Sequence, residues 1–334
     1  MNWFERLTGF VEDDYASTQA RLAMDGEDLV VASTGRRWHV GPFELPSLGD
    51  LRQRAQAANL GDAAVQWQPD VYGDVGQLHS QAENHGALFQ VASQFNMLEM
   101  VSSYVTPGHG VTRYADDHTQ GPACAMAGGA ATLFRNYLVP VAASGQLGSP
   151  GDPCGQTATR QIDGLADLQR AMANLAGGSP TDLWTMRNGY AMFTLAQVAR
   201  SAEILQACND TQRDGLRQLL RVGWQADTAV TAPDAPQGQQ VGQVFCAALP
   251  VAYCHSAADG PWQPLAQLVL EATYEATLLC AALRATERGP TPLYLTRVGG
   301  GAFGNNAAWI DAALAWARRA VPHGLVAVRH VRRG

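Results

Sequence analysis

Residues 292–306 combine a short apolar strand pattern, three successive glycines and the start of a helix pattern. Gly299, Gly300 and Gly301 have no Cβ, so they tolerate positive φ and let another molecule come close to the backbone. The helix expected over residues 306–319 would direct its free N–H groups and the positive end of its dipole at this loop. The segment therefore predicts an anion-binding loop, or else a tight turn without a ligand.

Strand and helix patterns alternate along most of the chain. Further strands are expected at residues 64–67, 87–92, 244–249 and 325–328, and further helices at residues 121–137, 195–207, 211–222 and 264–285. Such alternation predicts an α/β/α sandwich, in which helices cover both faces of a mixed sheet. We interpret residues 1–60 as an N-terminal accessory section and residues 61–334 as one α/β domain with insertions around residues 143–235.

The composition excludes several classes of function. All 23 basic residues are arginine, because the 334-residue chain contains no lysine. A lysine Schiff base and the lysine of a Walker A phosphate loop are therefore excluded. The net charge of −7 argues against a general nucleic-acid surface. The N-terminus lacks a signal pattern and no apolar run is long enough to cross a membrane, so we expect a cytoplasmic protein.

A second polar strand end occurs at residues 93–96, directly after an apolar strand pattern. A long loop follows, and a helix rich in small residues begins at Gly121. If this strand and the one before the glycine loop are parallel, both loops face one crevice at the carboxyl edge of the sheet. The ligand-binding residues predicted there are Gln94, Asn96, Gln120, Gly121, Gly299, Gly300, Gly301, Ala302, Phe303, Gly304 and Asn305.

These two segments resemble the ligand-binding loops of the macrodomain and poly(ADP-ribose) glycohydrolase-like superfamily. The more specific match is the ending Gly301-Ala302-Phe303-Gly304-Asn305, which is similar to the superfamily's diphosphate-binding loop. The resemblance implies a macrodomain-like fold that binds ADP-ribose and hydrolyses ADP-ribosyl bonds. It also implies that the glycine loop holds the diphosphate and that Asn96 orients the distal ribose.

The chain departs from the superfamily in its catalytic motif. The glycohydrolase pattern of three glycines followed by Gln-Glu-Glu is absent, and the usual Asn-Ala-Ala-Asn segment is Ser-Gln-Phe-Asn at residues 93–96. Cleavage of a glycosidic bond requires a carboxyl group that activates water or protonates the leaving oxygen. We expect this group to be Asp116 or Asp117, just before the helix, with Glu83 and then Asp74 as further candidates.

Three other interpretations stay open. A metal-dependent hydrolase is one, because residues 74–118 are rich in histidine and carboxylate side chains. A thiol nucleophile is another, because Cys124 would lie near a helix N-terminus, which lowers a thiol pKa. The third is a module that binds ADP-ribose without hydrolysis. The expected partner is ADP-ribose or an ADP-ribosylated macromolecule, with nucleic acid only as the modified substrate and with no membrane, metal or cofactor.

Overall fold

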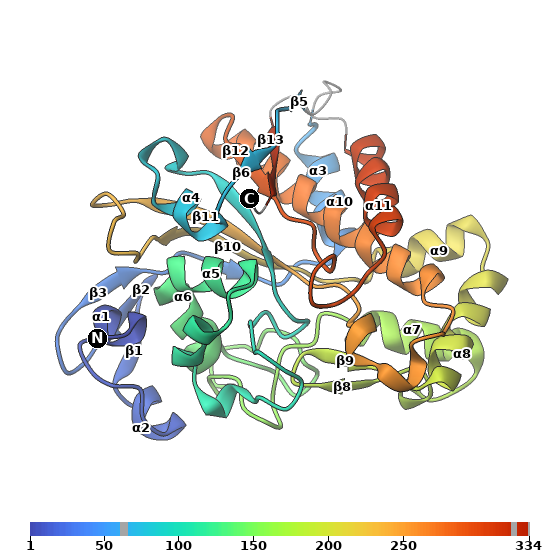
Figure 1. Cartoon of the computed structure of the whole chain (residues 1–334), viewed down its shortest axis with the longest axis horizontal. Coiled ribbons are helices and arrows are strands. Elements are labelled where there is room, and N and C mark those ends of the chain that lie inside the picture. Colours follow the sequence, from blue (N-terminus) through green and yellow to red (C-terminus); the bar gives the residue numbers. More distant parts are fainter. Residues whose placement is uncertain (61–65, 322–325, 333–334) are drawn as a thin grey trace.

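The computed structural model describes residues 1–60, 66–321 and 326–332. In these residues the central sheet has eight strands in the order β4-β10-β11-β7-β12-β13-β5, with β6 also paired to β13 (Figure 1). The strands are β4 (Phe43–Glu44), β5 (Gln66–Trp67), β6 (Val71–Tyr72), β7 (Leu88–Ala92), β10 (Gly223–Ala229), β11 (Gln240–Cys246), β12 (Pro292–Leu295) and β13 (Ala327–Arg332).

The sheet is mixed, as predicted. β7 pairs in parallel with β11 and β12, and β13 continues the parallel order beside β12. β10 is antiparallel to both β11 and β4. β7, β11, β12 and β13 therefore end at the same edge of the sheet, which is where open α/β sheets bind ligands.

Helices cover both faces of the sheet. They are α3 (Leu48–Ala57), α10 (Gln263–Arg288) and α11 (Ala307–Ala320) on one face, and α4 (Val75–Ser80), α5 (Gln120–Ala127) and α6 (Gly129–Leu133) on the other (Figure 1). Side chains alternate along β7: Leu88 joins the core that contains α10, whereas Phe89 and Val91 join the core beneath α4 and α5. The predicted three-layer sandwich is confirmed.

The first 60 residues pack onto this sandwich. β1 (Leu22–Asp25), β2 (Asp28–Val31) and β3 (Arg37–His39) form a separate antiparallel sheet beside α1 (Trp3–Thr8) and α2 (Tyr15–Gln19). The same segment supplies β4 to the main sheet. On α3, Arg52 donates hydrogen bonds of 2.6 and 2.9 Å to the carboxylate of Glu275 on α10.

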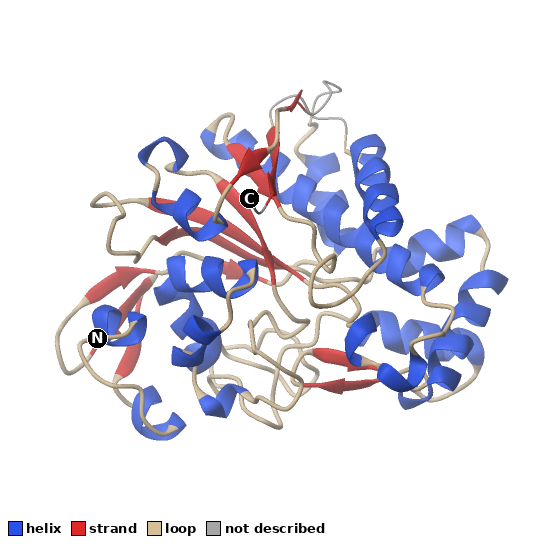
Figure 2. Cartoon of the chain, in the orientation of Figure 1, coloured by secondary structure: helices blue, strands red, loops and turns tan. Residues whose placement is uncertain are grey.

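The region before β10 forms a helical lobe with one hairpin. It contains α7 (Ala166–Ala176), β8 (Thr185–Arg187), β9 (Tyr190–Met192), α8 (Leu195–Ala207) and α9 (Asp210–Arg217). The β8–β9 hairpin is separate from the main sheet (Figure 2). The helix predicted over residues 195–207 is confirmed, whereas the one predicted over residues 211–222 ends at Arg217 because the chain turns into β10.

The helix predicted over residues 121–137 is wrong in its continuity. α5 ends at Ala127, and α6 is followed by a π-helical turn at Phe134–Leu138. A Cβ on Gly128 would lie 2.8 Å from Oε1 of Gln243, so the break makes room for this buried side chain. Nε2 of Gln243 donates to the carbonyl oxygen of Cys124 at 2.8 Å, which ties the helix to β11.

The remaining strand predictions are confirmed with shifted ends. The strand expected over residues 244–249 begins at Gln240 and ends at Cys246. The expected strands at residues 64–67 and 325–328 correspond to β5 and β13, and residues 64, 65 and 325 lie outside the described residues.

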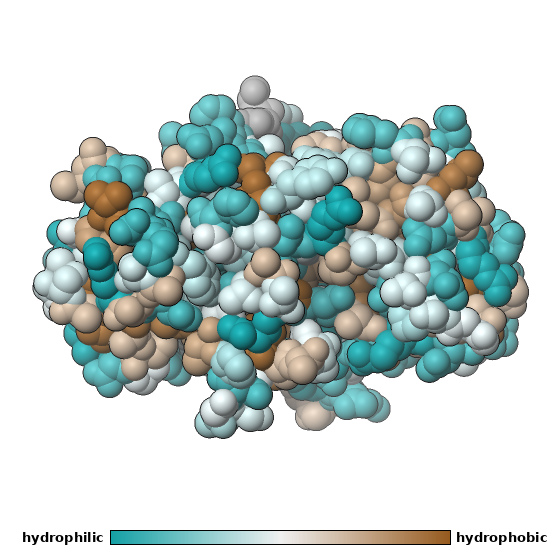
Figure 3. Space-filling view, turned by 90° about the horizontal axis from the view of Figure 1, so that it is seen from below, coloured by the Kyte–Doolittle hydropathy of each residue, from teal (hydrophilic) through white to brown (hydrophobic). Residues whose placement is uncertain are grey.

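On the face shown in Figure 3, hydrophobic residues form small groups among hydrophilic ones. No helix in the described part of the chain is long and apolar enough to span a membrane.

Candidate active site

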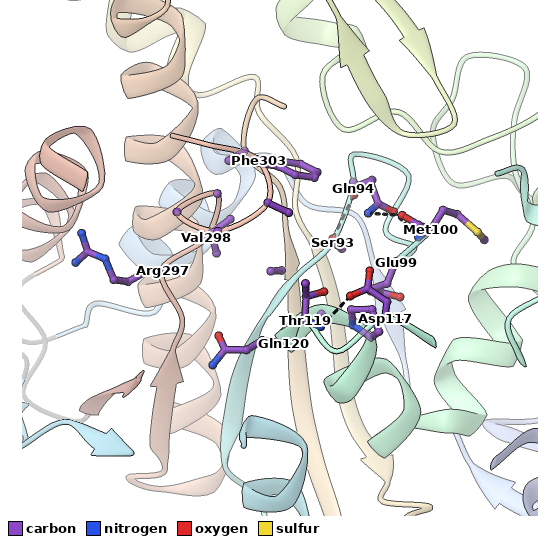
Figure 4. Close-up of a pocket in the computed structure, with 18 of the residues that line it drawn as sticks. Ser93, Gln94, Glu99, Met100, Asp117, Thr119, Gln120, Arg297, Val298 and Phe303 are labelled. Atoms are coloured by element: carbon purple, nitrogen blue, oxygen red, sulfur yellow. Dashed lines mark hydrogen bonds between the residues drawn. The ribbon is translucent and has the colours of Figure 1, made fainter. Parts of the chain in front are cut away.

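A cleft of about 590 Å³ opens at the carboxyl edge of the parallel strands. Residues at or just beyond the ends of four strands line it: Ala92 for β7, Ala248 for β11, Val298 for β12 and Arg332 for β13. Glu99 and Asp117 lie beside Thr119 on one side of the cleft, and Phe303 lies on the other (Figure 4). The two loops that the sequence analysis singled out thus meet at one site.

The glycine loop forms one wall of this cleft. Gly299 has a φ of +79°, and a Cβ on it would lie 2.5 Å from the Cβ of Ala248, so this position requires glycine. A Cβ on Gly301 would meet no heavy atom within 4 Å, so the backbone is accessible there. The N–H groups of Gly301, Ala302 and Phe303 have no acceptor among the described residues. They leave three donors for a ligand on this wall.

Gly304 and Asn305 shape the loop and do not line the cleft. Nδ2 of Asn305 donates to the carbonyl oxygens of Leu249, at 2.8 Å, and Gly299, at 3.3 Å. Gly304 has a φ of +70°, and a Cβ on it would lie 2.9 Å from the Cβ of Ala252. Both residues therefore hold the loop against the segment that follows β11.

The N-terminus of α5 forms the opposite wall. Gly121 packs so closely against the end of β7 that a Cβ on it would lie 2.0 Å from the carbonyl oxygen of Ala92. Thr119 makes no side-chain capping hydrogen bond, and the N–H groups of Gln120 and Gly121 have no acceptor in the described structure. These donors, together with the positive end of the helix dipole, favour an anion in the cleft.

The helix after the glycine loop does not contribute to the cleft. α11 begins at Ala307, and Asn306 caps it by accepting a hydrogen bond of 2.8 Å from the N–H of Ala308. None of its residues lines the cleft. Among the described helices, α5 therefore supplies the N-terminus that lines the cleft, whereas α11 begins just after the glycine loop.

Glu99 is a carboxyl group that the sequence analysis did not select. It lines the cleft in the loop after β7, and its side chain is fully buried. Neither carboxyl oxygen has a hydrogen-bond partner among the described residues, and Nη2 of Arg135 lies 3.7 Å from Oε2. Burial raises the pKa of Glu99 to about 8, while the charge of Arg135 opposes this rise. At neutral pH Glu99 is therefore mostly protonated and able to donate a proton.

One feature of the sequence marks Glu99. It is the single charged residue in the apolar segment from Met97 to Met100, directly after the strand end that carries the first predicted loop. A charged side chain in such a segment is rarely buried without a specific role. The signal was present but weak, because only the fold brings Arg135 behind it.

Gln94 fixes the loop that carries Glu99. Its Oε1 accepts a hydrogen bond of 2.7 Å from the N–H of Met100, and its Nε2 donates to the carbonyl oxygen of the same residue at 3.2 Å. Nε2 also lies 3.4 Å from the hydroxyl of Tyr190, which itself donates to Met100. Gln94 lines the cleft as expected, but these contacts engage its amide within the protein.

An aromatic cluster adjoins Asp117 in the cleft. The ring centroids of Tyr190, Tyr253 and Phe303 lie between 5.3 and 5.6 Å apart. Burial raises the pKa of Tyr253, and the negative charge of Asp117 adds to this rise, so that carboxylate lies close to the cluster. Oδ1 of Asp117 accepts a hydrogen bond of 2.8 Å from the N–H of Thr119. The cleft thus places an aromatic surface, which suits a sugar or base ring, beside a carboxylate.

Two arginines line the cleft, and each already has an acidic partner. Nη1 of Arg297 lies 2.7 Å from Asp311, and Arg332 pairs with Asp70. The side chain of Arg297 points away from Glu99 and Asp117 in Figure 4. Neutral backbone donors are therefore the main anion contacts that the cleft presents.

The predicted ribose contact lies outside the cleft. Asn96 is fully buried, and its Nδ2 donates to Oε1 of Gln161 at 2.9 Å. Its Oδ1 accepts a hydrogen bond of 3.2 Å from the N–H of Leu98. These bonds engage the amide within the protein, so Asn96 supports the loop that carries Glu99.

Of the predicted carboxylates, Asp117 is the one that lines the cleft in the described structure. Asp116 is exposed at the end of a 3₁₀ turn, Thr112–Asp116. Glu83 is exposed in another short 3₁₀ helix, and Asp74 caps the N-terminus of α4.

The histidines of residues 74–118 do not form a metal site. His79 is buried and stacks on Phe89 at 3.8 Å, and burial lowers its pKa to about 4. His85 and His109 each accept from a backbone N–H group. Within residues 1–60, 66–321 and 326–332, no group of three or more His, Cys, Asp or Glu side chains is arranged to hold a metal ion.

Cys124 does not have the surroundings of a reactive thiol. It is fully buried on α5. Burial raises the pKa of its thiol well above the usual value. Its environment therefore disfavours the thiolate that nucleophilic attack requires.

Comparisons with known proteins give matches among solved structures only. No family model matches the chain, and no curated protein matches it. The chain is similar to poly(ADP-ribose) glycohydrolase from Deinococcus radiodurans in complex with ADP-ribose, with 11% identity and a TM-score of 0.39 over 87% of each chain. The poly(ADP-ribose) glycohydrolase from Thermomonospora curvata has 12% identity and a TM-score of 0.38, covering 91% of this chain and 87% of that one.

Proposed function

We propose that the protein binds ADP-ribose, or a related nucleotide diphosphate, in the cleft and hydrolyses an ADP-ribosyl linkage. The observation that carries this proposal is the position of Glu99, a buried and mostly protonated carboxyl group on the wall of an anion-binding cleft. Backbone donors come from the glycine loop and from the start of α5, on opposite walls. Two such sets of donors suit two neighbouring phosphates.

Each wall has a defined part in the proposed reaction. The N–H groups of Gly301, Ala302 and Phe303 bind the diphosphate, and the aromatic cluster packs against the ring of the distal ribose. Glu99 gives its proton to the leaving oxygen as the bond between that oxygen and the anomeric carbon breaks. Water adds to the anomeric carbon, and its proton returns to the Glu99 carboxylate. Asp117 orients this water.

Replacement of Glu99 tests the proposal. In Glu99→Gln we expect kcat on an ADP-ribosylated substrate to fall about 100- to 10,000-fold, because the amide cannot donate an acidic proton. The affinity for ADP-ribose, measured by calorimetry, should stay close to that of the wild type. Asp116→Asn is the matched control, since Asp116 is exposed outside the cleft, and its turnover should be unchanged.

The outcomes separate the two candidate functions. Turnover that survives in Glu99→Gln and falls in Asp116→Asn would assign catalysis to the other carboxylate. A wild-type protein that binds ADP-ribose but cleaves no ADP-ribosyl linkage would be a binding module. A wild-type protein that binds no ADP-ribose at millimolar concentration contradicts both functions.

A further inference from the structure

Arg135 lies beside Glu99 and, unlike Glu99, does not line the cleft. Its side chain is fully buried, as is that of Glu99, and its Nη2 is 3.7 Å from Oε2 of Glu99. Arg135 belongs to the π-helical turn that follows α6. This buried arginine meets the carboxyl group without sharing an ordinary hydrogen bond with it, since the separation exceeds hydrogen-bond length.

Contacts that do not involve Glu99 fix the guanidinium in place. Nε donates to the carbonyl oxygen of Met97 at 2.9 Å, and Nη2 donates to Oγ1 of Thr132 at 3.1 Å. Its central carbon lies 3.6 Å from the ring centroid of Phe245. The charge therefore keeps its position whether Glu99 carries a proton or not.

The backbone around Arg135 departs from a regular helix. The N–H of Val139 donates to the carbonyl oxygen of Phe134 at 2.8 Å, which is the i to i+5 bond of a π turn. Such turns are rare and occur frequently at functional sites. The carbonyl oxygen of Arg135 itself accepts from Nε2 of Gln156 at 3.0 Å. Both bonds stabilise the turn that places Arg135 beside Glu99.

Packing alone gives little reason for a charge at this position. Replacing a buried ion pair with apolar residues is often neutral or stabilising. Nη1 of Arg135 has no hydrogen-bond partner among the described residues, and burial lowers the pKa of the guanidinium. The placement of this charge therefore calls for a role beyond folding.

Four titratable side chains lie around Glu99. Tyr114 accepts a hydrogen bond of 2.9 Å from the N–H of Glu99, Cys124 faces it from α5, and Asp117 shares its cleft. Arg135 is the cation in this set. Its charge lowers the pKa of Glu99 and so favours the carboxylate, against the larger effect of burial.

We propose that Arg135 is a positioning residue for Glu99, because its fixed guanidinium orients the buried carboxyl group and stabilises the carboxylate that forms when the proton passes to a ligand in the cleft. This role rests on the proposed hydrolase function. The carboxylate must survive in a buried site until a proton from water returns to it. Without a nearby cation, the proton would be held too tightly to be released to a leaving oxygen.

A direct titration of Glu99 tests this role without any substrate. Glutamate labelled with ¹³C at the side-chain carboxyl carbon reports the titration midpoint of Glu99 by NMR. The Glu99→Gln variant identifies the Glu99 signal, because that signal is missing from its spectrum. In Arg135→Met we expect the midpoint to rise by roughly 1–3 pH units, because an opposite charge at this range shifts a pKa by that amount. In Arg135→Lys, which keeps the charge, the midpoint should stay close to that of the wild type.

Activity provides a second readout. In Arg135→Met the high-pH limb of the pH profile of kcat/KM should move to higher pH, together with the titration midpoint of Glu99. Replacement of a merely structural residue would lower activity without moving this limb. If Arg135→Met does not fold, Thr132→Val retains the charge but removes one of its hydrogen-bond acceptors, and a smaller upward shift is expected. A Glu99 midpoint that does not respond in either variant overturns the role of Arg135. Failure of the wild type to hydrolyse, with the midpoint shift intact, contradicts the proposed function instead.

Discussion

The acidic residues near the cleft differ in chemistry because their surroundings differ. Asp116 is exposed to water. Asp117 is partly exposed and accepts a backbone hydrogen bond. Glu99 is fully buried without a hydrogen bond to either oxygen among the described residues, and this burial favours its neutral form. Its surroundings therefore make Glu99 a proton donor at neutral pH.

This property of Glu99 makes folding stability depend on pH. The pKa of Glu99 is raised from 4.5 to about 8 in the folded protein. Between these values the folded chain keeps a proton that the unfolded chain releases, so stability falls as the pH rises through this range. Relative to Glu99→Gln, the wild type should lose about 4 kcal/mol of unfolding free energy between pH 5 and pH 9.

Urea unfolding of both proteins at pH 5 and pH 9 measures this difference. The other titrating groups are the same in both proteins, so their contributions cancel in the comparison. A constant difference between wild type and variant at the two pH values would mean that Glu99 is ionised in the folded protein throughout.

At the residue scale, the sequence predicted the glycine loop better than the catalytic group. Three successive glycines leave a local pattern, and Gly299 and Gly301 have the conformational freedom and accessibility expected of such a loop. The chemistry of Glu99 comes instead from burial and from Arg135, which lies far along the chain. Asn96 was expected in the cleft because it follows a strand, but hydrogen bonds to Leu98 and Gln161 turn its side chain into the protein.

At the element scale, α5 packs tightly against the end of β7, where both elements line the cleft. A Cβ on Gly121 would overlap the carbonyl oxygen of Ala92. Gly121→Ala should therefore push α5 away from β7, with a loss of about 1–3 kcal/mol of unfolding free energy. ADP-ribose affinity should fall as well, because the donors at the start of α5 move with the helix.

Gly215→Ala on α9 is the matched control for this substitution. A Cβ there meets nothing within 4 Å, and alanine favours a helix over glycine, so stability should be unchanged or slightly higher. Thermal or urea unfolding of both variants makes the comparison. Equal stability of the two variants would show that α5 can shift without loss and that the close contact is unimportant.

Elements with a strong local pattern were predicted well, and those set by tertiary contacts were not. α8 has the predicted bounds because its sequence signals are local. Its capping residue, Thr194, directly precedes the helix, and its apolar periodicity lies within the helix. The helix expected over residues 121–137 is broken at Gly128 by the side chain of Gln243, which approaches from β11. The sequence near Gly128 carries no information about that contact.

At the scale of the whole molecule, the first 60 residues and the main sheet depend on one another. Removal of residues 1–60 would take away β4 and Arg52, leaving the buried carboxylate of Glu275 without its cation. Breaking such a buried pair costs about 3–5 kcal/mol. We expect the truncated chain to lose cooperative thermal unfolding. Arg52→Met in the full chain should lower the midpoint temperature of unfolding. A truncated chain with an unchanged midpoint would show that this segment is dispensable for folding.

The cleft also draws on distant parts of the chain. Tyr190, from the lobe before β10, hydrogen-bonds to Met100 beside Glu99 and packs against Phe303 of the glycine loop. The sequence analysis found no role for this lobe because its own pattern shows no motif. Its contribution becomes visible only when three segments of the chain meet in one site.

Calorimetric titration with ADP-ribose of the wild type, Gly301→Gln and Gly301→Glu tests the central claim most directly. Both substitutions place a side chain of similar size in the open space at Gly301, so their difference reports the charge alone. If the diphosphate lies on this loop, the wild type binds, and Gly301→Glu binds at least about tenfold more weakly than Gly301→Gln because like charges repel. Equal affinity of the two variants, or no binding by the wild type at millimolar ligand, would contradict a diphosphate site at the glycine loop.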